Sequence, residues 1–348
     1  MRTDDLDYDL PEGAIAQAPV EPRDAARLLV DCGPAEAPEH RFVRDLPELL
    51  CPGDLLVVND SRVIPARLRL HKATGAAVEV LLLERGADGW WQALVRPGRR
   101  VRSGAVLTHG DLAVEVGDDV GDDLGDGRRR VRLLVGDARL PAGPDGELAA
   151  LAAHGEVPLP PYIHTALREP ERYQTVFADR PGSVAAPTAG LHLTEGVLAR
   201  CAERGADLAR VELVVGLGTF RPIAADRVED HVMHAERYRV DAGTWARIQA
   251  APRVVAVGTT VVRTLESVAA TGELEGRTAL YLHGDAPFAV VDRLLTNFHV
   301  PRSSLLALVD AFVGARWRRL YETALADGYR FLSFGDAMLL DRSRGRSG

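Results

Sequence analysis

The chain contains the stretch Ser183-Val184-Ala185-Ala186-Pro187-Thr188-Ala189-Gly190-Leu191-His192-Leu193-Thr194-Glu195. Its apolar start predicts a buried strand, which the segment Pro187 to Gly190 ends, because proline gives no N–H to a ladder and glycine opens other backbone conformations. Thr194 suits the cap of a helix that stops near Gly205. His192 then precedes a helix N-terminus, whose positive end favours a neutral imidazole able to donate or accept a proton. From spacing alone, a surface histidine in a structural turn fits equally well.

The bulk composition predicts a soluble two-domain protein. The 348 residues are 46% hydrophobic and 26% charged, which is ordinary for a globular chain. No apolar run could span a bilayer and the acidic N-terminus lacks a signal peptide, so we expect a cytoplasmic protein. Three widely spaced cysteines indicate free thiols. A net charge of −8 argues against general coating of nucleic acid but permits one local basic surface.

Strand and helix patterns alternate in both the first and the last part of the chain. The run Leu55 to Val58 predicts a buried strand that ends at the polar cluster Asn59-Asp60-Ser61-Arg62. Ligands of open α/β sheets bind at the carboxyl ends of strands, which marks this cluster as a candidate site. Further predicted strands and helices are Val211–Val215, Trp245–Ala250, Arg253–Val257, Thr259–Val268, Phe288–Leu295 and Leu305–Val313.

Between about Ala66 and His154 the pattern changes to short alternating segments separated by Gly, Asp and Pro turns. This spacing is typical of a small all-β barrel or sandwich. We therefore predict an α/β protein: a mixed-sheet α/β main domain of residues 1–65 and 156–348, with an inserted small all-β barrel domain at residues 66–155. The predicted strands of the insertion are Val78–Leu83, Trp90–Val95, Ala105–Thr108, Leu112–Val116 and Val131–Val135.

Two glycine-containing turns follow predicted strands. The segment Val214 to Pro222 lacks the third glycine of a dinucleotide fingerprint, and its proline would interrupt the receiving helix, so we interpret it as a close backbone approach to a small ligand. The segment Arg253 to Glu266 places Gly258 between a strand and a helix. Free N–H groups at that helix start would bind a carboxylate or ribose hydroxyls, with Arg263 one turn further on; simple N-capping is the alternative.

Other polar positions could take part in chemistry. His231 and His234 would share a face if helical, and no nearby Cys, Asp or Glu set completes a metal site, so we predict hydrogen-bonding histidines and no metal. The segment Thr296 to Ser304 is a polar turn ahead of a helix. The segment Tyr329 to Phe334 predicts an aromatic strand before Asp336.

Several long and unusual runs occur in order along nearly the whole chain. They are Asp7–Pro11 with Ile15–Gln17, Asn59–Arg67, Pro158–Ile163, Arg172–Phe177, Ala185–His192, Gly218–Pro222, Val257–Arg263, Thr296–His299, and Tyr329–Phe331 through Gly335–Met338. Together these runs resemble the S-adenosylmethionine:tRNA ribosyltransferase-isomerase family of queuosine biosynthesis.

The resemblance implies an activity. Such an enzyme moves the ribosyl part of S-adenosylmethionine onto 7-aminomethyl-7-deazaguanine at the wobble position of tRNAs with GUN anticodons, and epoxyqueuosine forms as adenine and methionine leave. The resemblance also implies an α/β domain with an inserted β-barrel and no metal or cofactor, since S-adenosylmethionine is a substrate. Val214 stands where the family usually has His, and Leu193 where it usually has Phe. A paralogue acting on a small-molecule nucleoside and a non-catalytic tRNA-binding protein therefore remain alternatives.

The implied chemistry needs a base, hydrogen bonding to the leaving adenine, and groups that hold the methionine and ribose parts. We expect His192 to handle one proton, and Asp336 to pair with the methionine ammonium or the deazaguanine. The candidates for the second proton are His231, His234 and His299. The residues expected to hold S-adenosylmethionine or the substrate base are Arg62, Pro187, Thr188, Gly190, Gly218, Thr219, Phe220, Thr259, Thr260, Arg263 and Asn297.

A compact basic turn lies in the predicted insertion, at Arg96-Pro97-Gly98-Arg99-Arg100-Val101-Arg102. It is either a solvated loop or a phosphate-contacting patch, and phosphate contacts give affinity without reading sequence. We expect Arg96, Arg99, Arg100 and Arg102 to contact tRNA. The expected partners are a tRNA with a GUN anticodon and S-adenosylmethionine, with no membrane, and the expected state is a monomer.

Overall fold

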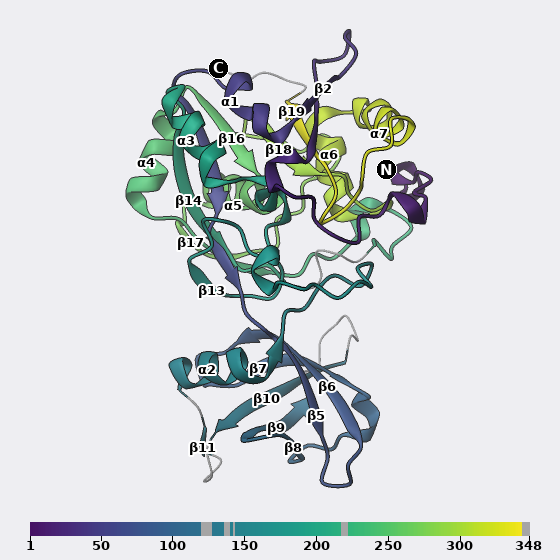
Figure 1. The fold of residues 1–348 in the computed structure, drawn as a ribbon, viewed down its shortest axis with the longest axis vertical. Helices are drawn as coiled ribbons and strands as arrows, with labels where there is room; N and C mark the ends of the chain where they lie inside the picture. Colours follow the sequence, from purple (N-terminus) through teal and green to yellow (C-terminus); the bar gives the residue numbers. More distant parts are fainter. Residues whose placement is uncertain (120–126, 136–139, 142, 217–221, 343–348) are drawn as a thin grey trace. The chain divides into compact units, whose positions relative to one another are not determined.

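The computed structural model describes residues 1–348 except 120–126, 136–139, 142, 217–221 and 343–348 (Figure 1). The chain forms two compact units. The first comprises Met1–Arg62, Pro160–Arg180 and Ala186–Gly348, and the second Val63–Leu159 with Pro181–Ala185. The sequence pattern placed the inserted segment at residues 66–155.

The first unit is built on a nine-stranded mixed sheet, with the order β17-β15-β14-β3-β16-β18-β19-β1-β2. Strands β14, β3, β16 and β18 run parallel, whereas β19 runs antiparallel to β18 and parallel to β1. In sheet order the bounds are β17 (Glu275–Thr278), β15 (Glu236–Arg239), β14 (Asp207–Leu213), β3 (Asp54–Asn59), β16 (Arg253–Val257), β18 (Arg293–Asn297), β19 (Ala337–Asp341), β1 (Arg27–Val30) and β2 (Glu39–Phe42).

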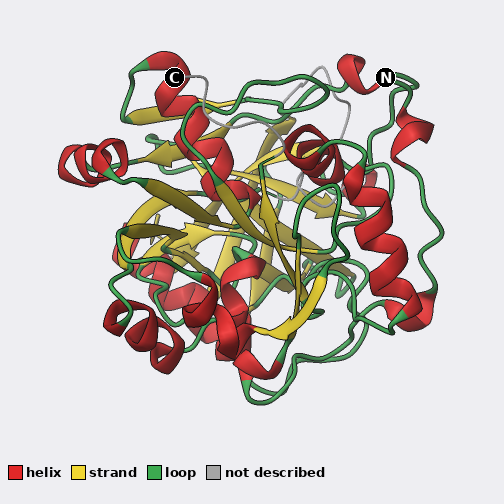
Figure 2. Ribbon diagram, turned by 90° about the horizontal axis from the view of Figure 1, so that it is seen from above, coloured by secondary structure: helices red, strands yellow, loops and turns green. Residues whose placement is uncertain are grey.

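The central strands are apolar on both faces, as parallel strands covered by helices must be. Leu56, Val255 and Leu295 belong to one core cluster, and their neighbours Val57 and Ala256 on the opposite face are equally buried. Helices flank the strands (Figure 2). They are α1 (Leu46–Leu49), α3 (Glu195–Glu203), α4 (Ala242–Ala250), α5 (Thr259–Thr271), α6 (Ser304–Val313) and α7 (Arg316–Ala326).

The segment from Ser183 to Glu195 has the predicted helix, but its apolar run from Val184 to Ala186 is not the predicted strand, because the strand lies before it. Strand β13 (Arg180–Ser183), which pairs with β4 (Ser61–Val63), ends at Ser183, and a 3-10 helix, η7 (Thr188–His192), follows. The hydroxyl of Thr194 accepts the N–H of Val197 at 3.1 Å and so caps α3, as predicted. The helix η7 lies against β18 of the central sheet.

The second unit contains an eight-stranded antiparallel sheet with the path β11-β10-β7-β6-β5-β8-β9, to which β12 adds by pairing with β5. Strand β9 also pairs with β10, so the path returns to β10. The bounds are β5 (Arg67–His71), β6 (Ala77–Arg85), β7 (Trp91–Arg96), β8 (Val106–His109), β9 (Leu112–Asp119), β10 (Arg128–Val135), β11 (Leu140–Pro141) and β12 (Gly155–Glu156).

The second unit is not all-β, because it also contains the helix α2 (Pro144–His154). The signals for it were in the sequence: Pro144 sits at the first helical position and an alanine-rich run follows. Glu147 on this helix is buried and accepts hydrogen bonds from Trp91 Nε1 and Arg85, which ties α2 to β6 and β7.

The predicted aromatic strand from Tyr329 to Phe334 is wrong. The segment bends, with Leu332 at φ +68°, and the strand begins later, at Ala337. Phe331 packs instead against Phe298 at a centroid distance of 4.6 Å. A Cβ on Gly335 would lie 2.3 Å from the carbonyl oxygen of Arg330, so only glycine allows the tight bend. Ring packing and this close approach override the strand preference of aromatic residues.

Candidate functional site

The carboxyl ends of β14, β3, β16 and β18 meet at one edge of the sheet, and the amino ends of β19 and β1 join them there. Asn59 ends β3. Its amide group bonds both backbone groups of Leu213, which ends β14, and its nitrogen lies 3.5 Å from Thr260 Oγ1 at the start of α5. The predicted polar cluster therefore lies at the expected edge.

Asp60, the next residue, belongs to the polar cluster that the sequence marked as a candidate site, but it was given no role of its own. Its side chain is buried, and one of its carboxylate oxygens, Oδ1, has no partner among the described residues. Desolvation raises the pKa of Asp60 to about 6, although Arg180 lies 3.6 Å from the other oxygen. A buried carboxyl with this pKa is a candidate functional group, and only tertiary structure reveals it.

The start of α5 follows the predicted pattern, and its arginine bonds other groups of the protein. Gly258 adopts φ +95°, and Thr259 and Thr260 are buried behind it. Arg263 forms a buried ion pair with Glu236 and donates to the carbonyl oxygen of Thr278 at 3.2 Å. Glu236 also accepts the N–H of Gly216 at 2.8 Å. Arg263 therefore holds neighbouring segments together in this structure.

Asn297, the last residue of β18, connects three groups. Its amide nitrogen donates to the carbonyl oxygen of Leu332 at 3.2 Å and lies 3.0 Å from His192 Nε2, while its oxygen accepts the hydroxyl of Thr188 at 3.0 Å. Because a carbonyl oxygen can only accept, Leu332 fixes the amide nitrogen on that side. His192 Nε2 must then be the acceptor, which leaves the ring proton on Nδ1.

His192 is buried and neutral. Burial is the largest cause that lowers its pKa, to about 4, and the charges of Arg330, Arg172 and Arg23 lower it further. The expectation of a neutral imidazole agrees with this direction, but the physical cause is different. Desolvation and three guanidinium groups keep the ring uncharged.

These three arginines were missed as site residues. Each is fixed by a backbone carbonyl oxygen: Arg23 by Gln174 at 2.6 Å, Arg172 by Val20 at 3.0 Å and Arg330 by Ala18 at 3.2 Å. They come from three distant parts of the chain. Arg172 and Arg330 lie in runs that carry the family resemblance, which was a signal available from the sequence.

His299 lies apart from His192. Its Nε2 contacts Thr296 Oγ1 at 2.9 Å, and Thr296 and Asn297 are consecutive strand residues that point to opposite faces of the sheet. His299 therefore belongs to the face opposite the Asn297 contacts. It is packed beside Tyr321, whose hydroxyl accepts the N–H of His299 at 2.9 Å, and burial lowers the pKa of His299 to about 3.

The carboxylate of Asp336 accepts hydrogen bonds from two backbone N–H groups. One carboxylate oxygen accepts the N–H of Arg27 at 2.9 Å and the other accepts the N–H of Arg330 at 2.8 Å. Asp336 is 3% exposed, so these two bonds leave little of it for a substrate. Its position in the structure favours a role in shaping the bend before β19.

His231 and His234 do not lie on a helix, because η9 (Val228–Asp230) ends just before them and the chain is then extended. His231 packs edge-on against Tyr281 with ring centroids 5.4 Å apart. Burial and the neighbouring His234 lower the pKa of His231. Within the described ranges, no group of three or more His, Cys, Asp or Glu side chains could hold a metal ion.

The remaining candidates divide between packing and surface roles. A Cβ on Gly190 would lie 2.7 Å from Phe177 Cζ, so close packing explains this glycine, and Pro187 precedes η7 as its N-cap. Arg62 donates to Glu171 at the surface at 2.5 Å. Leu193 is fully buried in the core cluster. Gly218, Thr219 and Phe220 lie outside the described residues.

Val214 is half-buried just after β14, and its N–H donates to the carbonyl oxygen of Arg237 at 2.9 Å.

In the second unit the basic turn follows β7 and includes the 3-10 helix η5 (Gly98–Arg100). Arg96, Arg100 and Arg102 are exposed. The side chain of Arg99 is not among those described.

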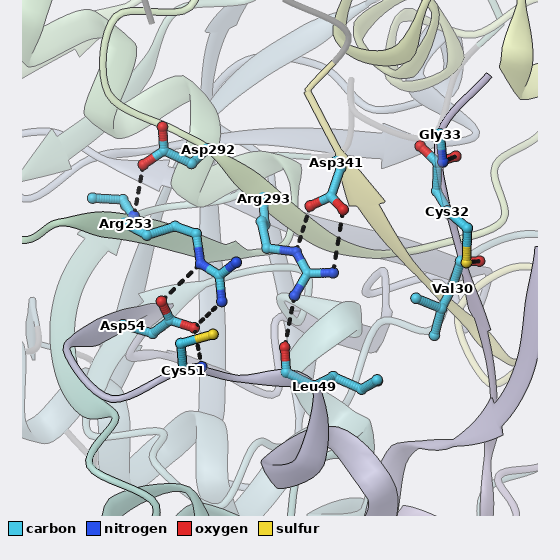
Figure 3. A network of polar contacts seen from close by, with 12 residues as sticks. Val30, Cys32, Gly33, Leu49, Cys51, Asp54, Arg253, Asp292, Arg293 and Asp341 are labelled. Carbon is cyan, nitrogen blue, oxygen red and sulfur yellow. Dashed lines mark hydrogen bonds and ion pairs between the residues drawn. The ribbon is translucent and has the colours of Figure 1, made fainter. Parts of the chain in front are cut away.

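At the opposite edge, where the parallel strands begin, ion pairs join neighbouring strand ends (Figure 3). We call this the amino edge. Asp54 at the start of β3 is buried and accepts Arg253 Nε at 2.7 Å. Arg293 at the start of β18 pairs with Asp341 and donates to the carbonyl oxygen of Leu49 at 2.8 Å. A similar pair joins Asp31 and Arg316 beyond β1.

A mixed α/β sheet with buried polar groups at the carboxyl edge is typical of α/β proteins that bind ligands where their parallel strands end. The family model described as "Queuosine biosynthesis protein" matches residues 3–340. The chain belongs to this family, and the resemblance drawn from its motifs is confirmed.

Relatives and a solved structure agree with this membership. A protein from Anaeromyxobacter dehalogenans named S-adenosylmethionine:tRNA ribosyltransferase-isomerase is 51% identical, over 98% of this chain and 100% of the relative. One of the same name from Rubrobacter xylanophilus is 50% identical over 98% of both chains. The crystal structure of S-adenosylmethionine tRNA ribosyltransferase from Thermotoga maritima is 37% identical, covers 96% of this chain and 99% of its own, and has a TM-score of 0.54.

The comparisons favour the enzyme over both alternatives raised by Val214, because the relatives that match along the full length bear one enzyme name. In the part of the chain that the structure describes, no helix has the length and apolarity needed to cross a bilayer.

Proposed function

We propose that the protein transfers and isomerises the ribosyl part of S-adenosylmethionine onto 7-aminomethyl-7-deazaguanine in the wobble position of GUN-anticodon tRNAs. It is an S-adenosylmethionine-dependent tRNA ribosyltransferase-isomerase. The observation that carries this is the full-length identity of about 50% to enzymes of that name. The products are epoxyqueuosine-tRNA, adenine and methionine, and S-adenosylmethionine is consumed as a substrate with no further cofactor.

The contacts of His192 support a role as a hydrogen-bond donor. With Nε2 occupied by Asn297 and a pKa near 4, the ring is a weak base, and its protonated Nδ1 can act only as a donor. Departing adenine gains negative charge on a ring nitrogen, and a positioned donor in a buried site stabilises such charge. His192 thus assists the leaving group. Asn297 and Thr188 set its tautomer.

Removal of the proton beside the sulfonium needs a separate base. Asp60 fits this role better than the remaining histidines, because its buried, unpartnered oxygen lies at the carboxyl edge and its pKa of about 6 is close to neutral. The free N–H groups of Thr259 and Thr260 at the start of α5 would receive ribose hydroxyls.

The second unit would hold the tRNA backbone. The return of its strand path to β10 supports a small barrel, with the inserted domain near the predicted residues 66–155. Arg96, Arg99, Arg100 and Arg102 would neutralise phosphates. The modified base must leave the anticodon stack to be reached. A monomer in the cytoplasm is sufficient for this reaction.

The test is a mass-spectrometric assay with S-adenosylmethionine and a GUN-anticodon tRNA bearing 7-aminomethyl-7-deazaguanine. The proposal expects epoxyqueuosine and adenine in equal amounts. If neither forms while a control enzyme converts the same tRNA, the activity is absent, and Val214→His would show whether that position is responsible.

The tRNA surface is tested by charge reversal. Arg99→Glu with Arg100→Glu should weaken tRNA binding and lower the slope of log affinity against log salt by about 2, since about 0.9 counterion is released per phosphate contact. The matched control reverses Arg41 and Arg44, which are also exposed. Equal loss in both double variants would discard the basic turn.

A further inference from the structure

Beside His192 the structure gathers hydrogen-bond donors that lack acceptors. Arg330 Nη2 is buried and has no hydrogen-bond partner among the described residues; its nearest carboxylate oxygen, on Asp336, lies 3.8 Å away. Thr175 Oγ1 is also buried and unpartnered. Thr175 lies close to His192 in the fold, because its Cγ2 would be 3.0 Å from a Cβ on Gly190.

The charges around His192 also favour an anionic ligand. The groups whose charges act on His192 are Arg330, Arg172 and Arg23, and no carboxylate is among them. The acids that pair with the neighbouring arginines, Glu21 and Glu171, are 67% and 72% exposed, so solvent screens them. The buried acid beside the cluster is Asp336, whose two oxygens already accept backbone N–H groups, so three guanidinium groups face one buried carboxylate and the interior side is net cationic.

We propose that Arg23, Arg172 and Arg330, with the hydroxyl of Thr175, form a subsite for an oxyanion, and that the anion is the carboxylate of S-adenosylmethionine. This rests on the proposed function and specifies where the methionine part binds. A guanidinium fork matches a planar carboxylate with two parallel hydrogen bonds. The two unpartnered donor atoms, Arg330 Nη2 and Thr175 Oγ1, are buried, and a small carboxylate reaches buried atoms more easily than a backbone phosphate of a large RNA does.

Arg23 and Arg172 already bond carbonyl oxygens, and Arg172 also pairs with Glu21, so these two contribute charge while Arg330 supplies the free donor. The other arginines expected to hold the ligand have no such free donor. Arg263 is bonded to Glu236 and two carbonyl oxygens inside the protein. Arg62 pairs with Glu171 at the surface. Arg330, by contrast, uses Nη1 on a carbonyl oxygen and keeps Nη2 for an acceptor that the described chain does not supply.

The test compares S-adenosylmethionine with its decarboxylated form, which keeps the adenosine, sulfonium and amine. Both are titrated calorimetrically into protein saturated with a GUN-anticodon transcript, whose unmodified wobble guanine lacks the accepting amine. Wild type should prefer S-adenosylmethionine by about 10- to 100-fold, as expected for hydrogen bonds to a charged group. In Arg330→Met the preference should fall to about threefold or less, whereas Arg41→Met, an exposed control, should keep it.

General damage to the site would weaken both ligands alike and leave their ratio unchanged, so the ratio isolates the carboxylate. A wild type that binds both ligands equally, or an Arg330→Met protein that keeps the full preference, overturns the subsite alone. A wild type that binds neither overturns the proposed function as well. If Arg330→Met keeps the preference but binds tRNA more weakly, with a smaller salt slope, the anion is a phosphate and the assignment is wrong.

Discussion

The two edges of the central sheet are built from similar residues but differ in how their buried carboxylates are satisfied. At the amino edge, Asp54 and Asp31 are buried, and each is paired with an arginine at hydrogen-bond distance. At the carboxyl edge, Asp60 keeps an oxygen without a partner and His192 remains neutral. Buried groups are normally satisfied, so unsatisfied ones indicate where a ligand is expected.

The difference separates stability from chemistry. Closed ion pairs at the amino edge hold the strand starts and are expensive to break once one partner is lost. At the carboxyl edge, a buried polar atom without a partner lowers the stability of the free protein. A bound substrate that supplies the missing hydrogen bond would remove this penalty. Substitutions at the first edge should therefore change unfolding, and those at the second should change turnover.

The largest effect on stability is expected from Arg253→Met. The change leaves the buried carboxylate of Asp54 without its cation and should lower the free energy of unfolding by about 3 kcal/mol. Urea denaturation measures this loss, and single-turnover rates per folded molecule should stay within about twofold of wild type. An unchanged unfolding midpoint with a large loss of turnover would reverse the roles of the two edges.

The next effect concerns Asn297→Asp. A carboxylate oxygen would replace the amide nitrogen facing His192 Nε2, which should raise the pKa of His192 well above 4 and change its tautomer. We expect a loss in turnover of about 10²- to 10³-fold, typical of losing one positioned donor. An NMR titration of His192 follows the pKa. Thr296→Val, which affects only the opposite face, is the control and should keep its turnover.

A smaller effect is expected in the pH dependence of stability. The pKa of His299 is lowered by burial from 6.5 to about 3, so acid protonates this histidine first in the unfolded chain and the native state loses stability below pH 6.5. His299→Gln removes this loss. The difference in unfolding free energy between wild type and variant should therefore shrink by up to about 1.4 kcal/mol per pH unit below 6.5. A difference that is constant between pH 7 and pH 5 would show that His299 is not buried neutral.

The sequence predicted much of this architecture because the signals were local. Thr194 predicted the start of α3 as its N-cap, and continuous apolar runs predicted β3 and β16. The bend at Tyr329 to Phe334 was misjudged, because its aromatic residues pack onto Phe298 from a distant part of the chain. The helix α2 was missed although its signals were present.

The site was predictable only in part. His192, Thr188 and Asn297 were all expected to be site residues, because each lies in a run that carries the family resemblance. The structure connects them through hydrogen bonds. The occupation of Arg263 by Glu236 and the opposite orientation of His299 depend on tertiary contacts that no local pattern encodes. The free nitrogen of Arg330 is likewise visible only once three distant segments are brought together.

The most direct measurement is the single-turnover rate of His192→Ala on tRNA bearing 7-aminomethyl-7-deazaguanine, with the unfolding midpoint measured on the same preparation. The account predicts a rate at least about 100-fold below wild type in a protein that remains folded, because the donor to the leaving adenine is gone. A folded variant with near-normal turnover would contradict the assignment of the chemistry to the carboxyl edge.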